Sequence, residues 1–241
     1  MNLFNFYLLE PRFEMYSLSH IIAISLTFLS IILLYLFQKR IQENQRIEIL
    51  LRYLIVSILA SGEILLQYWY MATNEWKIEH GLPLQLCDFS IFLCIILLIR
   101  KSFSIFEIVY FTGVGGALVA ILSPELWLGF PHFRFYHFFL SHAAILFANF
   151  YMIWIYQFRP NLKSILKVFF FINGFGVFVF FINSMIDANY MFISKPTYNN
   201  TFLNHLGPYP YYLISLEGIM IIICFILYIP FRIRDYLTPL K

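Results

Sequence analysis

Seven long stretches of mainly apolar residues recur along the chain, separated by short polar connections. They fall at roughly 18–38, 50–72, 84–99, 104–122, 135–158, 164–187 and 209–230. A membrane-spanning helix needs about 20 consecutive apolar residues, and these stretches lack the period-two alternation of a transmembrane barrel. The pattern predicts an all-α, polytopic integral membrane bundle with seven transmembrane helices. Residues 1–241 are expected to form a single transmembrane domain.

The composition agrees with this pattern. Of the 241 residues, 61% are hydrophobic and 12% are charged, whereas a soluble domain carries about 25% charged residues. The sequence has no cluster of Lys and Arg of the kind that would indicate nucleic-acid binding. The first apolar stretch is too long for a signal-peptide core, so we expect an uncleaved first helix. The abundance of Phe, Ile and Tyr is typical of an AT-rich genome and points to a bacterial cell membrane.

The basic residues predict the orientation of the bundle. Of the 16 Lys and Arg residues, 12 fall in connections on one side of the predicted membrane and four fall on the other. Short cytoplasmic loops carry an excess of Lys and Arg. The asymmetry therefore predicts that the N-terminus is outside the cell and the C-terminus inside. With an even number of spans, the basic and less basic connections would no longer alternate between the two sides, so the charge pattern favours seven spans.

Polar residues inside the predicted spans gather at one depth, the outer half of the membrane. They are Glu63 with Gln67; Gln85, Cys87 and Asp88; His137, Ser141 and His142; Asn183 and Asp187; and Glu217. Ionisable groups within a bilayer are costly and usually face protein or a cavity. Three pairs have i,i+4 spacing, which places both members on one helix face. We expect a polar cavity that opens toward the outer leaflet.

Cys87 and His142 are the most reactive members of this set. Cys87 lies at the predicted start of the third span, where the N-terminus of a helix favours a thiolate. His142 lies about two turns into the fifth span, deeper than an interfacial residue. For His137, Glu63 and Glu217, a purely structural role remains an alternative. The histidines and carboxylates match no recognised metal motif, so no metal site is expected.

The fourth span is rich in small residues. Gly113 with Ala117, and Gly116 with Ala120, form small-xxx-small pairs, which allow two helix backbones to approach closely. The pairs indicate tight packing inside the bundle or, alternatively, the interface of a homodimer.

Five ordered motifs carry a family resemblance. They are Leu82-Pro83-Leu84-Gln85-Leu86-Cys87-Asp88; Pro124-Glu125; Phe138-Phe139-Leu140-Ser141-His142; Asn189-Tyr190-Met191-Phe192 with Lys195-Pro196; and Leu206-Gly207-Pro208-Tyr209-Pro210-Tyr211-Tyr212. In this order they resemble the YwaF-like family of bacterial integral membrane proteins, related to the eukaryotic transmembrane-protein-164 family. The chain departs from the family pattern at Gln85, where members carry histidine, and at Tyr209 or Tyr211, where they carry tryptophan.

The resemblance implies an acyltransferase that acts on phospholipids through a cysteine nucleophile and a histidine partner, here Cys87 and His142. No cofactor is implied. In this hypothesis Asp88, Asp187 or Glu217 orients the histidine, and Asn183, Gln85 or backbone amides near Cys87 stabilise the oxyanion. Lys195 and Tyr190 would hold the lipid headgroup, in a loop that covers the cavity. Because acyl-CoA is cytoplasmic, an outward site predicts a membrane phospholipid as donor and a lysophospholipid as acceptor.

The alternative hypothesis is a non-enzymatic lipid- or solute-binding membrane protein or transporter. Buried Glu63, Asp187 and Glu217 would suit a proton- or cation-coupled carrier. The sequence shows no internal repeat and no polar path through the inner half of the spans, which a carrier needs.

Overall fold

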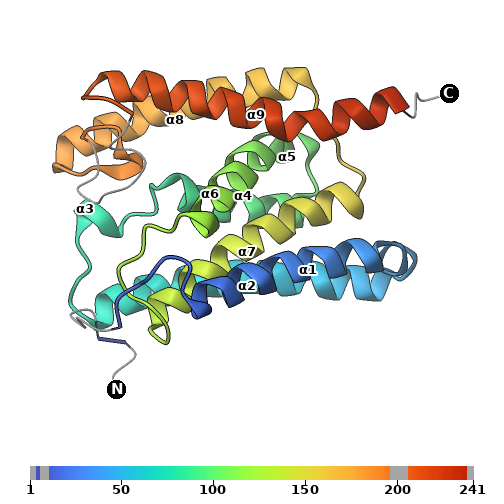
Figure 1. Ribbon diagram of the computed structural model, residues 1–241, viewed down its shortest axis with the longest axis horizontal. Helices are drawn as coiled ribbons and strands as arrows, with labels where there is room; N and C mark the ends of the chain where they lie inside the picture. The colour runs from blue at the N-terminus through green and yellow to red at the C-terminus, as the bar shows by residue number, and fades with distance from the viewer. Residues whose placement is uncertain (1–3, 6–10, 196–205, 238–241) are drawn as a thin grey trace.

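The computed structural model of the chain describes residues 4–5, 11–195 and 206–237, and those residues form a helical bundle (Figure 1). The elements are α1 (Leu18–Glu43), α2 (Gln45–Ala72), α3 (Ile78–Gly81), α4 (Leu86–Arg100), α5 (Phe103–Val109), the π-helical turn η1 (Tyr110–Val114), α6 (Gly115–Leu122), α7 (Phe133–Trp154), α8 (Leu162–Ile186), the 3₁₀ turn η2 (Tyr190–Phe192) and α9 (Tyr211–Leu237). Within the described residues the β-structure is limited to one isolated bridge, between Arg12 and Leu128.

Six of these segments are long and apolar enough to cross a membrane. They are α1, α2, α7, α8, α9 and the continuous helix formed by α5, η1 and α6. The prediction of an all-helical, multi-pass membrane protein is therefore confirmed. The remaining predicted span, α4, has 15 residues, which reach about 22 Å, less than the roughly 30 Å of a bilayer core. The seventh span and the orientation stay predictions.

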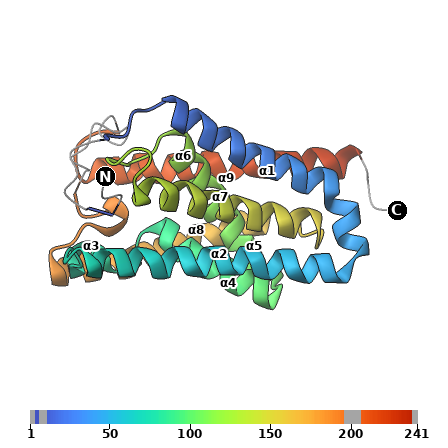
Figure 2. The same ribbon diagram turned by 90° about the horizontal axis from the view of Figure 1, so that it is seen from below.

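Helix α7 lies at the centre of the bundle. In Figure 1 the helices α8 and α9 form one outer layer, α1 and α2 form the opposite one, and α4 to α7 lie between them. Helix α7 packs against α1, α2, α4 and α6, and Leu146, Ala148, Tyr151 and Met152 on it are fully buried. Helices α1, α2, α7, α8 and α9 run roughly along one common direction, which Figure 2 shows from below, and the helix of α5, η1 and α6 crosses them obliquely.

The two ends of the bundle differ. The end that carries α3 and η2 is called the α3 end here. At the opposite end, polar groups are paired within the protein. Glu48 accepts hydrogen bonds from Arg52 Nε at 2.9 Å, from Tyr151 Oη at 2.9 Å and from Tyr156 Oη. Arg52 also donates to the carbonyl oxygen of Leu98 and so joins α2 to the last turns of α4.

The small residues of the fourth predicted span serve contacts inside the bundle. A Cβ atom added to Gly113 would lie 2.9 Å from Cγ2 of Ile145 on α7, and one added to Gly115 would lie 3.0 Å from Cγ2 of Ile223 on α9. Such close approach requires glycine. These contacts favour the packing interpretation of the glycines, and the homodimer through this span stays a prediction.

Candidate functional site

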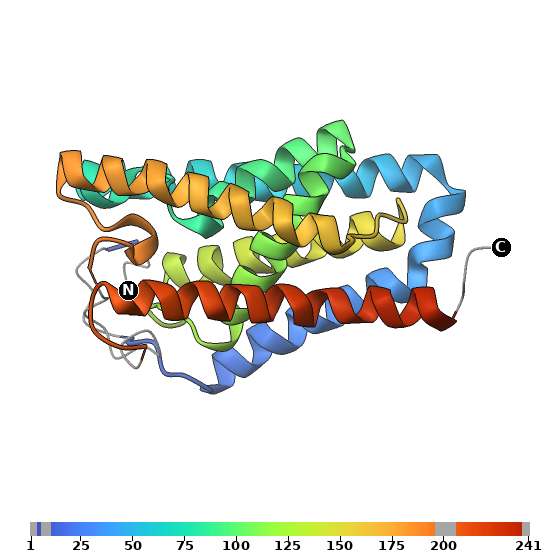
Figure 3. The ribbon, with the colours of Figure 1, turned by 90° about the horizontal axis from the view of Figure 1, so that it is seen from above.

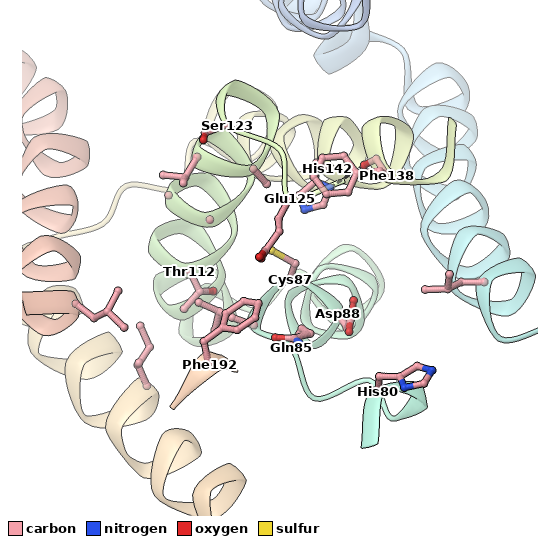
Figure 4. A pocket seen from close by; sticks show the side chains of 18 of the residues that line it. His80, Gln85, Cys87, Asp88, Thr112, Ser123, Glu125, Phe138, His142 and Phe192 are labelled. Atoms are coloured by element: carbon pink, nitrogen blue, oxygen red, sulfur yellow. Dashed lines mark hydrogen bonds between the residues drawn. The ribbon is translucent and has the colours of Figure 1, made fainter. Parts of the chain in front are cut away.

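A cavity of about 660 Å³ lies at the α3 end, among α2, α4, α6, α7 and α9. Figure 3 shows α8 and α9 running along the near side of the bundle. Its polar lining includes Gln85, Cys87 and Asp88 from α4 and the segment before it, and His137 and His142 from α7. The structure thus brings five of the predicted site residues into one cavity. Figure 4 shows the labelled members around it.

Cys87 is the second residue of α4, in the first turn of the helix. A helix begins with backbone N–H groups that have no acceptor within the helix, and within the described part of the chain the amides of Leu86, Cys87 and Asp88 have no recorded acceptor. All three residues line the cavity. A Cβ atom on Gly116 would lie 3.8 Å from the Cys87 Sγ atom, so this glycine leaves the space beside the thiol open. The first turn of α4 therefore combines a thiol with amides that are available to an anion.

His142 has one ring nitrogen engaged and the other available. Its Nδ1 atom lies 2.7 Å from the carbonyl oxygen of Phe138, one turn earlier in α7. A carbonyl only accepts, so Nδ1 carries the proton and Nε2 of the neutral ring holds a lone pair. Among the described residues no side chain or amide bonds to that Nε2. Since His142 lines the cavity, its Nε2 atom can accept a proton from a group inside the cavity.

His137 has the opposite arrangement. Arg134 donates from Nη1 to Nδ1 of His137 at 3.2 Å, so the lone pair of this ring is occupied. The proton of the neutral ring is then on Nε2, which faces Ser141 Oγ at 3.5 Å and the carbonyl of Gly62. Ser141 is buried and does not line the cavity. His137 and Ser141 therefore join α7 to α2, and His137 cannot accept a further proton without losing the bond from Arg134.

Gln85 and Asp88 shape the start of α4. The carboxylate of Asp88 accepts a hydrogen bond from the backbone N–H of Gln85, the residue before the helix. This contact is half of a capping box and stabilises the helix start. The Gln85 Oε1 atom accepts the amide N–H of Met191 at 2.9 Å, which ties α4 to η2. Both residues thus hold Cys87 in place from two sides.

Glu63 lies behind the cavity wall. Its Oε1 atom accepts a hydrogen bond from Gln67, which lines the cavity, and Gln67 accepts one from Trp76. The Oε2 atom of Glu63 is buried without a hydrogen-bond partner in the described structure. A buried carboxylate oxygen without a donor is costly, so this arrangement suits the protonated acid.

Besides Glu63 and Ser141, five predicted residues lie outside the cavity lining: Asn183, Asp187, Tyr190, Lys195 and Glu217. The Asn183 amide bonds both backbone groups of Tyr190 at 2.9 and 3.0 Å, which fastens the turn after α8. Asp187 is exposed at the C-cap of α8. Neither residue contacts His142 or Cys87 in the recorded bonds. Glu217 has one buried carboxylate oxygen without a partner in the described structure.

Tyr190 is 1% exposed and serves the loop rather than a ligand. Its hydroxyl donates to the carbonyl of Ile78 at 2.6 Å and accepts the amide of Leu82 at 2.9 Å. Burial raises the pKa of Tyr190 to about 12. Lys195 is half-buried, and its backbone is bonded to Asn189. Residues 196–205 of the predicted covering loop lie outside the described residues, although Phe192 from its first part does line the cavity.

One wall of the cavity is apolar. Helix α9 contributes Leu216, Ile219, Met220, Ile223 and Cys224, at spacings that place all five on one helix face. These side chains cannot bond a polar ligand, so they suit a hydrocarbon chain.

Two charged lining residues were not among the predicted site residues. Arg134 lies three residues before His137 and eight before His142, so helical periodicity on α7 could have identified it. Glu125 enters the cavity from the loop after α6 (Figure 4). Loop residues follow no periodicity, and the sequence marked Glu125 only as part of the Pro124-Glu125 motif, without a role. No group of three or more His, Cys, Asp or Glu residues within the described ranges could hold a metal ion.

Comparison with known proteins gives one match. The model of the TMEM164 family matches residues 15–228, which is most of the chain. No curated protein and no solved structure gives a significant match.

Proposed function

The chain belongs to the TMEM164 family, and from this premise we propose that it is a membrane-embedded phospholipid acyltransferase or transacylase that acts through Cys87 and His142. One observation carries the proposal. A thiol in the first turn of α4 and a histidine with an available Nε2 lone pair line the same cavity, which also has an apolar wall. A nucleophile, a base and a site for an acyl chain are the parts that acyl transfer needs.

The first half of the reaction forms an acyl-enzyme. His142 Nε2 takes the proton of the Cys87 thiol, and the sulfur attacks the ester carbonyl carbon of a phospholipid. The carbonyl oxygen becomes an oxyanion, for which the amides of the first turn of α4 are the available donors. When the tetrahedral intermediate collapses, the ester C–O bond breaks and His142 returns its proton to the departing lysophospholipid oxygen. The product is a thioester on Cys87.

The second half reverses these steps with another acceptor. The hydroxyl of a second lysophospholipid gives its proton to His142 Nε2 and attacks the thioester carbonyl. The C–S bond breaks, and the sulfur recovers the proton from His142. Water in place of the lysophospholipid would release a fatty acid, so exclusion of water by the apolar wall of α9 favours transfer over hydrolysis.

The predicted orientation places this cavity at the outer leaflet of a bacterial cell membrane. A cytoplasmic acyl-CoA could not reach it there, so the donor in this proposal is a membrane phospholipid. The inferred substrates are therefore two lipids of the same leaflet, and the enzyme needs access from one side of the membrane only.

The second candidate is a lipid- or solute-binding protein or transporter. The buried, unpartnered carboxylate oxygens of Glu63 and Glu217 favour it, because such acids take up and release protons in carriers. The opposite end counts against it, since Glu48 and Arg52 pair there and Glu107 pairs with Lys167 at 2.8 Å. A carrier requires a path at both ends.

The test is a transfer assay with purified protein. Phospholipid labelled in its acyl chain and unlabelled lysophospholipid are incubated with wild type, Cys87→Ser and Cys94→Ser. The second cysteine is fully buried away from the cavity and serves as the matched control. Label should reach the acceptor with wild type and Cys94→Ser, and a labelled thioester should be trapped on Cys87 alone. Equal transfer by Cys87→Ser would overturn the assignment, and no transfer by folded wild type would favour the second candidate.

A further inference from the structure

Arg134 is a cation in the cavity to which no ion pair is recorded among the described residues. It lines the cavity, and in the described part of the chain no carboxylate lies within ion-pair distance of it. The Arg134 side chain is half-buried, and a partly buried charge that lacks an ion-pair partner is unfavourable. The cost is compensated when a ligand supplies the opposite charge.

The side chain is held in place by neutral groups. Its Nη1 atom donates to Nδ1 of His137 at 3.2 Å, and its guanidinium carbon lies 5.8 Å from the ring centroid of Trp69. Its Nε atom is buried and has no acceptor, and no acceptor is recorded for Nη2 among the described residues. A phosphate or carboxylate in the cavity can accept a bond from Nη2, and a second, parallel bond from the buried Nε requires the side chain to shift.

The charge of Arg134 acts on Asp88 and Glu63, but no ion pair joins it to either acid, or to the lining residue Glu125, in the described structure. Asp88 accepts the backbone N–H of Gln85 at the start of α4. Glu63 accepts from Gln67 through Oε1, and no described residue, Arg134 included, donates to its Oε2 atom. The anion that Arg134 lacks is therefore not provided by either of these acids.

We propose that Arg134 binds the phosphate of a phospholipid headgroup and so positions the lipid for the site at Cys87; the positioning, though not the binding, rests on the proposed function. The bond to His137 holds the guanidinium near the level of that residue. His137 precedes His142 by five residues, about 7.5 Å along α7. The phosphate and the acyl esters of a phospholipid are joined by a short glycerol backbone, so a phosphate at Arg134 places an ester near His142 and Cys87.

This assignment differs from the predicted headgroup residues. Lys195 and Tyr190 lie outside the cavity lining, and the hydroxyl of Tyr190 already has two partners. Arg134 lies at the first turn of α7, at the end of the cavity nearest the membrane surface in a bundle of this orientation. The acyl chains would then extend along the apolar face of α9.

The test measures lipid binding without turnover. Full-length protein carrying Cys87→Ser, purified in detergent, is titrated with phosphatidylglycerol and with the diacylglycerol that has the same chains but no phosphate. The Cys87→Ser protein should bind phosphatidylglycerol about tenfold more tightly than diacylglycerol, as expected for charge-assisted hydrogen bonds. Adding Arg134→Gln should abolish that difference, and Arg134→Lys should keep the charge but weaken binding several-fold.

The control is Arg46→Gln, an exposed arginine at the start of α2 and outside the cavity, which removes the same charge and should leave binding unchanged. The inference is overturned if folded Arg134→Gln binds phosphatidylglycerol as tightly as the Cys87→Ser protein does and if that protein binds the two lipids equally. If Arg134→Gln does not fold, Arg134→Lys takes its place in this comparison. Binding of inorganic phosphate as tight as that of phosphatidylglycerol, lost in Arg134→Gln, would also overturn the inference, in favour of a free-phosphate site. Lipid binding that depends on Arg134 in a protein without transferase activity would refute only the proposed catalysis.

Discussion

Nδ1 of His142 lies 2.7 Å from the carbonyl oxygen of Phe138, and this contact decides which histidine of α7 can act as a base. His137, one turn away, has its lone pair occupied by Arg134. We expect His142→Gln to reduce acyl transfer by about 10²–10⁴-fold, the usual contribution of a general base. His137→Gln should reduce transfer less than tenfold, because glutamine can still accept the bond from Arg134.

The measurement is single-turnover formation of the Cys87 thioester, with phosphatidylglycerol binding measured in parallel. His142→Gln should bind the lipid and fail to form the thioester. If the two variants had the same rate, the different hydrogen bonding of the two rings would not explain the chemistry.

The sequence was sufficient to predict the helices and to place five of the predicted site residues, Cys87 and His142 among them, at one end of the bundle. Long hydrophobic stretches indicate helices that face lipid. Counting residues inward from the helix ends places Cys87 and His142 at a similar height in the bundle. The sequence did not reveal that Asn183 bonds the backbone of Tyr190. The chain turns back after Asp187, so the partner of this amide is the following loop and not a neighbouring helix. In the sequence, Arg134 was only one of the four basic residues on the predicted outer side. Which groups surround its side chain depends on the tertiary structure, which the sequence pattern does not show.

Gly113 should be intolerant of substitution. A Cβ atom there would lie 2.9 Å from Ile145 Cγ2 and 3.1 Å from Asn149 Nδ2, both in the packed centre of the bundle. Gly113→Ala should lower the free energy of unfolding by about 1–3 kcal/mol, the usual cost of overpacking. The matched control is Gly174→Ala on α8, where no atom lies within 4 Å and alanine favours a helix. Unfolding in detergent, followed by circular dichroism, measures both, and equal stability of the two variants would contradict the packing argument.

The orientation can be tested by chemical labelling. With the three native cysteines replaced, Lys77→Cys at the α3 end and Glu43→Cys at the opposite end provide two exposed thiols. The excess of Lys and Arg on one side predicts that a membrane-impermeant maleimide labels residue 77 in intact cells and residue 43 only after lysis. The reverse result would place the cavity on the cytoplasmic side and make acyl-CoA an accessible donor.

His132 should make the start of α7 sensitive to acid. Its Nδ1 atom accepts the amide N–H of Arg134 at 3.1 Å, and its Nε2 atom lies 3.2 Å from the carbonyl of Asn5. Burial lowers the pKa of His132, the bond to Asn5 opposes this, and the nearby charge of Arg134 lowers it further. The folded state thus binds the proton less well than the unfolded state, whose histidine pKa is about 6.5.

A lowered pKa means that stability rises with pH in the interval between the folded and unfolded pKa values. The contribution of His132 should therefore be complete above about pH 6.5 and decline as the pH falls below it. His132→Asn keeps a side-chain acceptor for the helix start but does not titrate. The unfolding midpoint of wild type should fall between pH 7 and pH 5 by more than that of His132→Asn. Parallel pH profiles for the two proteins would show that protonation of His132 does not affect the stability of the fold.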